Sequence, residues 1–137
     1  GRLALVLLLD QLPRVIHRGT PDAFAQDAKA RLIAELGLRS GADRLLRPVE
    51  RVFFYLPFEH SEDPADQEKS IALFEDLAAS VPAEWRETFD SFVDFAVRHR
   101  DIIDRFGRFP HRNKALDRES TAAELEFLVA GGSSFGQ

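Results

Sequence analysis

Apolar residues recur at helical spacing through most of the chain. The clearest stripe lies between Trp85 and Phe106 and predicts a helix of about six turns, which Gly107 and Pro110 end. Its apolar positions are Trp85, Phe89, Phe92, Val93, Ala96, Ile103 and Phe106. Near the start, the run Leu3–Leu9 has no polar face. It predicts a helix from Leu3 to Ile16 with a kink or an early stop at Pro13. Because a helix that is apolar all round is usually buried, we expect this one to be a central core helix.

Two further helices are predicted from their first residues. Thr20 can cap a helix whose first turn holds Pro21, and the pair Asp63-Pro64 repeats this arrangement. Proline is tolerated there because the first turn of a helix has no partner for its N–H groups. Gly37 is expected to end the first of these two helices, and the break at Val81-Pro82 to end the second.

The last two elements depend on weaker patterns. Pro48–Phe58 is rich in aromatic and branched residues and resembles a buried strand, yet the chain offers no second strand to pair with it. We therefore predict a short helix that ends at Pro57. Thr121 lies three residues before Glu124, the spacing of a capping box, and predicts a final helix. Together these elements predict an all-α protein of about six helices.

Composition and charge narrow the class of protein. The 137 residues fit one domain, residues 1–137, with 45% hydrophobic and 30% charged residues. Cysteine is absent, which excludes disulfides and thiolate metal sites and is consistent with a cytoplasmic location. The net charge of −5 argues against a nucleic-acid partner. The run Leu3–Leu9 is far shorter than a membrane span, so we expect no membrane partner either.

Two segments carry opposite charge. Residues 59–68 hold five acidic residues and no Lys or Arg, whereas residues 98–114 hold six basic residues and two acidic ones. Either both are solvated surfaces, or they form two walls of one cleft. The basic segment ends in a loop that carries Arg108, His111, Arg112 and Asn113. Guanidinium groups suit phosphate and carboxylate, so this loop indicates a site for a small anion.

Histidines 60, 99 and 111 are candidate general bases or metal ligands. No two of them lie four apart on one helix, and the chain has no His-Glu-x-x-His pattern, so we expect no metal site. Ser61 lies outside any Gly-x-Ser-x-Gly turn, which argues against a serine nucleophile. No glycine-rich phosphate loop occurs, and no cofactor is implied.

Four blocks of the chain together resemble the DUF924 family of bacterial proteins of unknown function. They are Leu8–Asp27, Tyr55–Gln67, His99–Asn113 and Ser120–Leu128, and they include the motifs His-Ser-Glu and Arg-Phe-Gly-Arg-Phe-Pro-His-Arg-Asn. The resemblance implies an antiparallel helical array related to tetratricopeptide-like superhelices. It also implies that family members carry a further N-terminal helical segment, which we expect to be missing here. The resemblance implies no particular activity.

We predict that polar residues of these blocks converge on one pocket that binds a small anion. His60 or His111 is the candidate for catalytic proton transfer, oriented by Glu62 or Asp66. The expected ligand-binding residues are Asp10, Arg14, Arg18, Gln67, His99, Arg105, Arg108, Arg112 and Asn113.

Three alternatives to the anion pocket stay open. They are a peptide- or protein-binding module, a hydrolase whose nucleophile is not identified, and a scaffold whose polar blocks fix helix packing. Whether the protein is an enzyme, and its oligomeric state, are also open.

Overall fold

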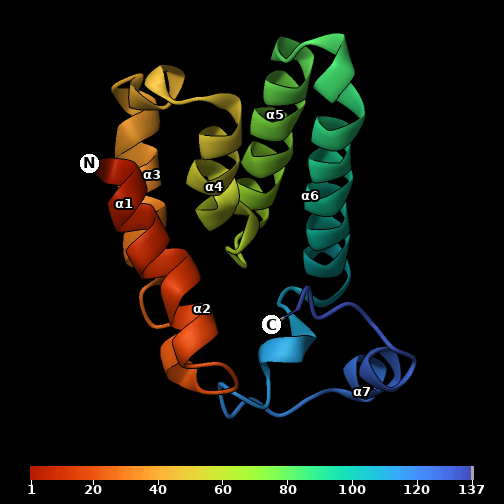
Figure 1. Cartoon of the computed structure of the whole chain (residues 1–137). Coiled ribbons are helices and arrows are strands. Elements are labelled where there is room, and N and C mark those ends of the chain that lie inside the picture. Colours follow the sequence, from red (N-terminus) through yellow and green to blue (C-terminus); the bar gives the residue numbers. More distant parts are fainter. Residues whose placement is uncertain (137) are drawn as a thin grey trace.

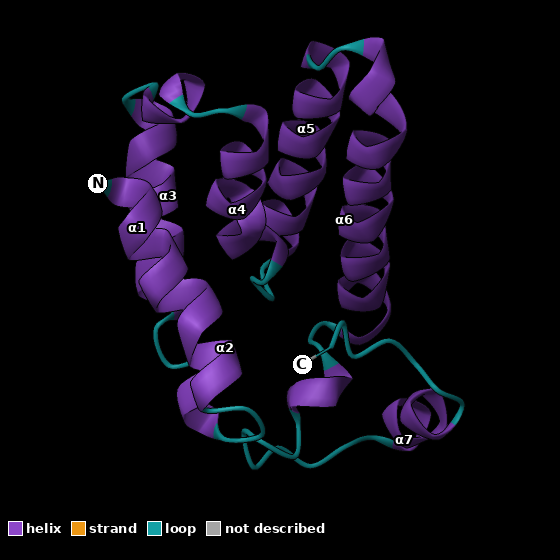
Figure 2. Cartoon of the chain, viewed as in Figure 1, coloured by secondary structure: helices purple, strands orange, loops and turns teal. Residues whose placement is uncertain are grey.

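The computed structural model describes residues 1–136, and within them the chain is helical without any strand (Figure 2). The α-helices are α1 (Arg2–Val6), α2 (Leu12–Ile16), α3 (Asp27–Arg39), α4 (Pro48–Glu59), α5 (Pro64–Ser80), α6 (Arg86–Phe106) and α7 (Ala122–Val129). A π-helical segment, Leu7–Gln11, joins α1 to α2 without a break. If Arg2–Ile16 is counted as one helix, the described residues form six, which confirms the predicted all-α class.

The first helix does not stop at Pro13, because its hydrogen-bonding pattern changes from α to π just before the proline. The N–H of Leu12 donates to the carbonyl of Leu7, five residues back, which is the wider π spacing. The segment therefore absorbs one extra residue just before the proline, whose missing N–H would interrupt a regular helix. The helix faces inward with Val6, Asp10, Pro13 and Arg14.

The prediction of a central core helix is wrong. Leu5, Leu8, Leu12, Val15 and Ile16 are all exposed, and the first helix lies at the outer edge of the array beside α3 (Figure 1). A helix that is apolar on all sides is thus not always buried on all sides, because here only one face of the helix has other helices packed against it.

Helices α3, α4, α5 and α6 pack side by side, and each runs antiparallel to the one before it (Figure 1). The core between them and the first helix is mostly aromatic and aliphatic. It includes Val6, Phe54, Tyr55, Phe58, Phe74 and Leu77, each at most 2% exposed. The antiparallel packing fits the expected array, while its relation to tetratricopeptide-like superhelices stays a prediction.

Several predicted helix ends are confirmed. Asp63 caps α5 by accepting a hydrogen bond from the N–H of Ala65, and Thr121 caps α7 by accepting from the N–H of Glu124. Gly107 ends α6 in the left-handed conformation, with φ of +73°. Trp85 precedes α6 in a short 3-10 turn, Ala83–Trp85, and is 47% exposed.

Two predicted ends are wrong. Gly37 lies inside α3, which continues to Arg39, because it makes room for the ring of Phe54 on α4; a Cβ at Gly37 would lie 2.4 Å from Phe54 Cζ. Pro57 lies inside α4, which ends two residues later at Glu59. Pro21 does follow Thr20, but it opens a separate 3-10 turn, Pro21–Ala23, and α3 begins only at Asp27.

The alternation of helix directions brings several helix ends to one end of the array (Figure 1). The C-terminal end of α4 meets the second half of the first helix there, together with the N-terminal ends of α3 and α5. The chain after α6 returns to the same end through the 3-10 turn Pro110–Arg112 and α7. Among the described helices, none is both long and apolar enough to cross a membrane.

Candidate functional site

The C-terminal end of α4 places two polar side chains in the interior. The inward face of this helix carries Phe54, Tyr55 and Phe58, and the chain continues in the same turn to Glu59 and His60. Glu59 is fully buried and His60 is 6% exposed. Across from them, His99 projects from the middle of α6 and is 1% exposed.

Both histidine rings are oriented through their Nδ1 atoms. The Nδ1 of His60 lies 2.7 Å from the carboxylate of Asp10, which comes from the π-helical segment. The Nδ1 of His99 lies 2.8 Å from the carbonyl oxygen of Phe95, one turn earlier on α6. A carbonyl oxygen only accepts, so Nδ1 of His99 carries the hydrogen and Nε2 of the neutral ring carries the lone pair. Asp10 fixes His60 in the same way.

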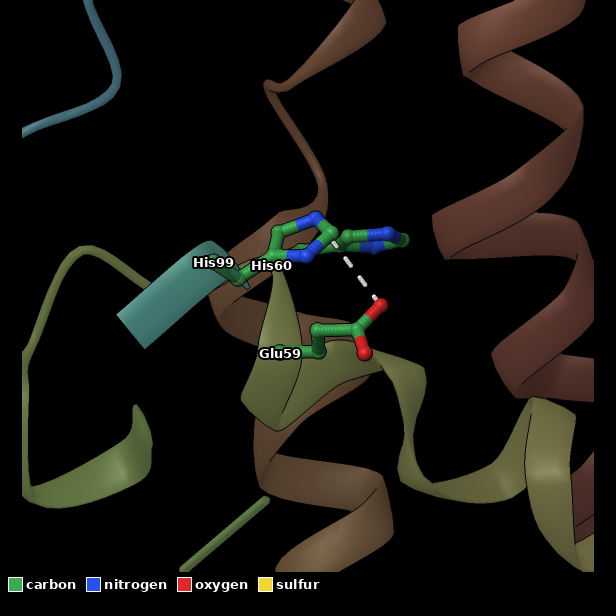
Figure 3. A group of neighbouring side chains, drawn as sticks. All are labelled: Glu59, His60 and His99. Atoms are coloured by element: carbon green, nitrogen blue, oxygen red, sulfur yellow. Dashed lines mark ion pairs between the residues drawn. The ribbon is translucent and has the colours of Figure 1, made fainter. Parts of the chain in front are cut away.

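Glu59 completes the group of three neighbouring side chains, which Figure 3 shows with their polar ends toward one another. Its Oε2 lies 3.8 Å from Nε2 of His99, too far for a hydrogen bond. One potential ligand atom from each of Glu59, His60 and His99 lies within 4.8 Å of the others. Within residues 1–136, no group donates a hydrogen bond to either carboxylate oxygen of Glu59 or to Nε2 of His99.

Burial dominates the electrostatics of this group. It raises the pKa of Glu59 to about 8, and the nearby charge of Asp10 adds to the effect. Burial also lowers the pKa of His99 to about 3 and lowers that of His60, so both rings are neutral near pH 7. Burial opposes ionisation of Asp10, but attraction to His60 and Arg14 outweighs it and holds the pKa of Asp10 at about 2.

A network of charged groups supports Asp10 from behind. Arg14 lies 3.4 Å from Asp10 and forms two hydrogen bonds, of 2.7 and 2.9 Å, with the carboxylate of Asp27. Arg112 donates to the carbonyl oxygen of His60 at 2.9 Å and lies 3.8 Å from Asp27. Burial, with repulsion from Arg14, lowers the pKa of Arg112 to about 10. The two arginines therefore hold the first helix, α3 and the residues after α6 around His60.

A cavity of about 250 Å³ opens beside the three side chains. Glu59, His60 and His99 form one part of its wall. Gln11 and Arg14 of the first helix, with Arg18 in the turn after it, form another. Phe135 also lines it, with its ring stacked on His99 at 3.6 Å between ring centroids.

A second cavity of about 650 Å³ is also lined by His60. Its lining includes four acidic residues and two arginines, namely Asp27, Glu62, Asp63, Asp66, Arg31 and Arg112.

The predicted site residues are divided among these places. The structure brings Asp10, Arg14, His60, His99 and Arg112 together, and it puts Arg18 at the first cavity. Asp66 is instead paired with Arg31 through two guanidinium nitrogens and accepts from the hydroxyl of Ser61.

Glu62 belongs to a separate network around the loop after α6. It accepts hydrogen bonds from Arg118 and from the N–H of Phe109, and so does not orient a histidine. In the same network, Asn113 contacts Glu124, and Arg108 pairs with Glu124 at 3.1 Å. These contacts tie the loop to α7.

Three predicted residues contribute elsewhere. Gln67 donates to the carbonyl oxygens of Glu59 and Ser61, which fixes the turn after α4. Arg105 lies over the rings of Phe106 and Phe127. His111 lines a different cavity, with Gly19, Phe24, Lys114 and Ala115.

Sequence reasoning missed Glu59 and Asp27 as site residues, and it missed Arg31, Arg118 and Glu124 as partners. For Glu59 a signal existed: an acidic residue directly follows the apolar residues of α4 and directly precedes a histidine. For Asp27, Arg31, Arg118 and Glu124 no such signal existed, because their contacts arise only when distant segments of the chain pack together.

Comparisons with known proteins agree with this architecture. A family model described as "Bacterial protein of unknown function (DUF924)" matches residues 1–132. The solved structure of a protein of unknown function from Agrobacterium tumefaciens is 44% identical, with a TM-score of 0.83. The match covers 95% of this chain and 68% of that one. No curated protein matches.

Proposed function

The chain belongs to the DUF924 family of bacterial proteins, whose function is unknown, and we propose that its 250 Å³ cavity binds a small phosphate- or carboxylate-bearing anion. The observation that carries the proposal is the placement of Gln11, Arg14 and Arg18 along one wall of this cavity. Guanidinium and amide groups are the donors that proteins commonly use for such anions.

The charge around the cavity favours an anion. Asp10 and Asp27 balance Arg14 and Arg112, which leaves Arg18 as an additional positive group. Arg18 is exposed at the cavity and forms no ion pair with any residue from 1 to 136. The Nε of Arg14 is buried and has no hydrogen-bond partner among the same residues, so it offers a donor. The cavity volume suits a small ligand rather than a nucleotide.

The peptide-binding alternative has less support. The larger cavity is mostly acidic, which does not suit an acidic peptide. Two basic residues of the segment 98–114 are also engaged in ion pairs, since Arg100 contacts Glu68 and Asp101, and Arg108 contacts Glu124. The hydrolase alternative still requires an activated water.

A thermal-shift titration with inorganic phosphate and with succinate tests the anion proposal. At 100 times its dissociation constant, a ligand should stabilise the chain by about 2.7 kcal/mol. Arg18→Ala should abolish the shift without lowering the melting temperature of the ligand-free protein. Arg86→Ala is the matched control, because Arg86 is exposed at the start of α6 and pairs only with Asp90 within the described chain. An equal shift in both variants would contradict the proposal.

A further inference from the structure

Glu59, His60 and His99 form a group of hydrogen-bond acceptors, and no other group among residues 1–136 donates a hydrogen bond into its centre. Each histidine uses its Nδ1–H on an acceptor behind it, Asp10 for His60 and the carbonyl of Phe95 for His99. Their Nε2 atoms are left with lone pairs, and the carboxylate of Glu59 adds two more acceptor oxygens. Acceptors repel one another at short range, so buried acceptors require a hydrogen or a cation between them.

We propose that this group binds a divalent first-row transition-metal ion, with Zn²⁺ as its representative. The ligands are Nε2 of His60, Nε2 of His99 and the carboxylate of Glu59. Two imidazoles and one carboxylate are a ligand set that such ions favour, and the chain has no cysteine or methionine to offer instead. This proposal replaces the expectation from sequence that no metal is bound.

The distances suit an ion after a small contraction. Ligand atoms at about 2.1 Å from a metal ion are at most about 4.2 Å apart. The Glu59 Oε2 to His99 Nε2 separation of 3.8 Å already meets this limit, and the outer limit of 4.8 Å for the whole group exceeds it by a fraction of an ångström. Rotation of the Glu59 side chain can shorten the separations that involve its carboxylate, because neither of its oxygens is held by a hydrogen bond from residues 1–136. Shortening between the two imidazoles requires movement of the rings themselves.

The surroundings match those of a metal site in two respects. A metal-binding histidine usually donates its other nitrogen to a carboxylate or a backbone carbonyl, and here one histidine does each. Metal binding displaces the proton that Glu59, with its pKa of about 8, holds near pH 7, and the negative charges of Glu59 and Asp10 together then offset a divalent ion. Three protein ligands also leave a coordination position, and the group borders the cavity that Gln11 and Arg14 line.

The inference goes beyond the proposed anion site, since the ion needs no anion in order to bind. Where both are present, the open position would let the anion coordinate the ion directly. The rival occupant of the group is a proton held by Glu59, and metal titration separates the two.

The first measurement uses the chain after chelator treatment and dialysis into a buffer without phosphate or carboxylate. Calorimetric titration with ZnCl₂ should show one ion bound per chain. In a long-range ¹H–¹⁵N spectrum, Zn²⁺ should shift the Nε2 signals of two of the four histidines, His60 and His99. Absence of binding by the folded chain, or shifts confined to His17 or His111, would overturn the proposal and leave the proton as the occupant.

Variants then test each ligand. Glu59→Gln keeps the size of the side chain and removes its charge, and it should weaken Zn²⁺ binding by about 100-fold or more. Asp10→Asn should weaken it by about 10- to 100-fold through His60. His17→Gln is the control, since His17 is exposed outside the group, and should leave the affinity unchanged. Circular dichroism verifies that each variant is folded, and unchanged affinity in a folded Glu59→Gln variant would overturn the assignment.

The anion and metal proposals fail separately. Phosphate stabilisation that persists in chelator, with no Zn²⁺ binding, supports the anion site and overturns the metal site. Binding of one Zn²⁺ without stabilisation by phosphate or succinate supports the metal site and overturns the anion site.

Discussion

At the scale of residues, Gln67 shows how a buried amide positions the candidate site. Its side-chain nitrogen donates to the carbonyl oxygens of Glu59 at 2.7 Å and Ser61 at 2.6 Å, on either side of His60. Gln67→Leu would leave both carbonyls without this donor, so we expect the free energy of unfolding to fall by about 1–3 kcal/mol in urea denaturation. Gln26→Leu, at an exposed position, should change it little. Equal effects of the two substitutions would contradict this role.

The candidate site itself was only partly predictable from its residues. Asp10 and Arg14 are four apart on one helix, so their proximity follows from helical geometry alone. Glu59 and His99 are forty positions apart in the chain and lie on different helices, so no local sequence pattern predicts that they are neighbours. His111, Arg105 and Arg108 lie in the same basic segment as Arg112, yet the turn after α6 sends their side chains to different neighbours. The composition of the sequence therefore predicted the region of the candidate site, but only tertiary packing determines which residues of that region belong to it.

At the scale of elements, Gly107 decides where α6 stops and where the loop Arg108–Asn113 begins. Its φ of +73° is costly for a residue with a side chain, and a Cβ there would meet no atom within 4 Å. Gly107→Ala should therefore destabilise the chain by about 1–2 kcal/mol through backbone strain alone. Gly107→Asn should cost less, because asparagine tolerates this conformation. Thermal unfolding of both variants measures the difference, and an equal loss would point to a packing defect instead.

Helix boundaries were predictable where a local hydrogen bond sets them and unpredictable where packing does. The caps Asp63 and Thr121 act on the next turn of their own helices, so the sequence suffices. Gly37 resembles a helix end, but the close approach of Phe54 from α4 is what requires a glycine there. The exposure of Leu5 and Leu8 on the first helix likewise depends on which neighbours pack against it.

At the scale of the whole molecule, several paired carboxylates make stability depend on pH. Hydrogen bonds from Arg118 and the N–H of Phe109 outweigh burial and lower the pKa of Glu62, and bonds from Arg31 and Ser61 do the same for the pKa of Asp66. A carboxyl with a lowered folded-state pKa stabilises the fold above its unfolded pKa of about 4. That contribution is lost as the pH falls through the folded value. The urea midpoint should therefore drop from pH 6 to pH 3, with a shallower drop in Glu62→Gln. An identical slope in that variant would contradict the assignment.

The position of Trp85 has a consequence for spectroscopy. It is the sole tryptophan and is half exposed at the turn between α5 and α6. His99 lies fourteen positions further along the chain, about 20 Å away at the rise of an α-helix. Its emission should follow the unfolding of the α5–α6 pair and stay constant while the cavity fills with phosphate or succinate. Fluorescence therefore gives an unfolding signal that is separate from occupancy, and each binding constant has to come from calorimetry or from the histidine resonances.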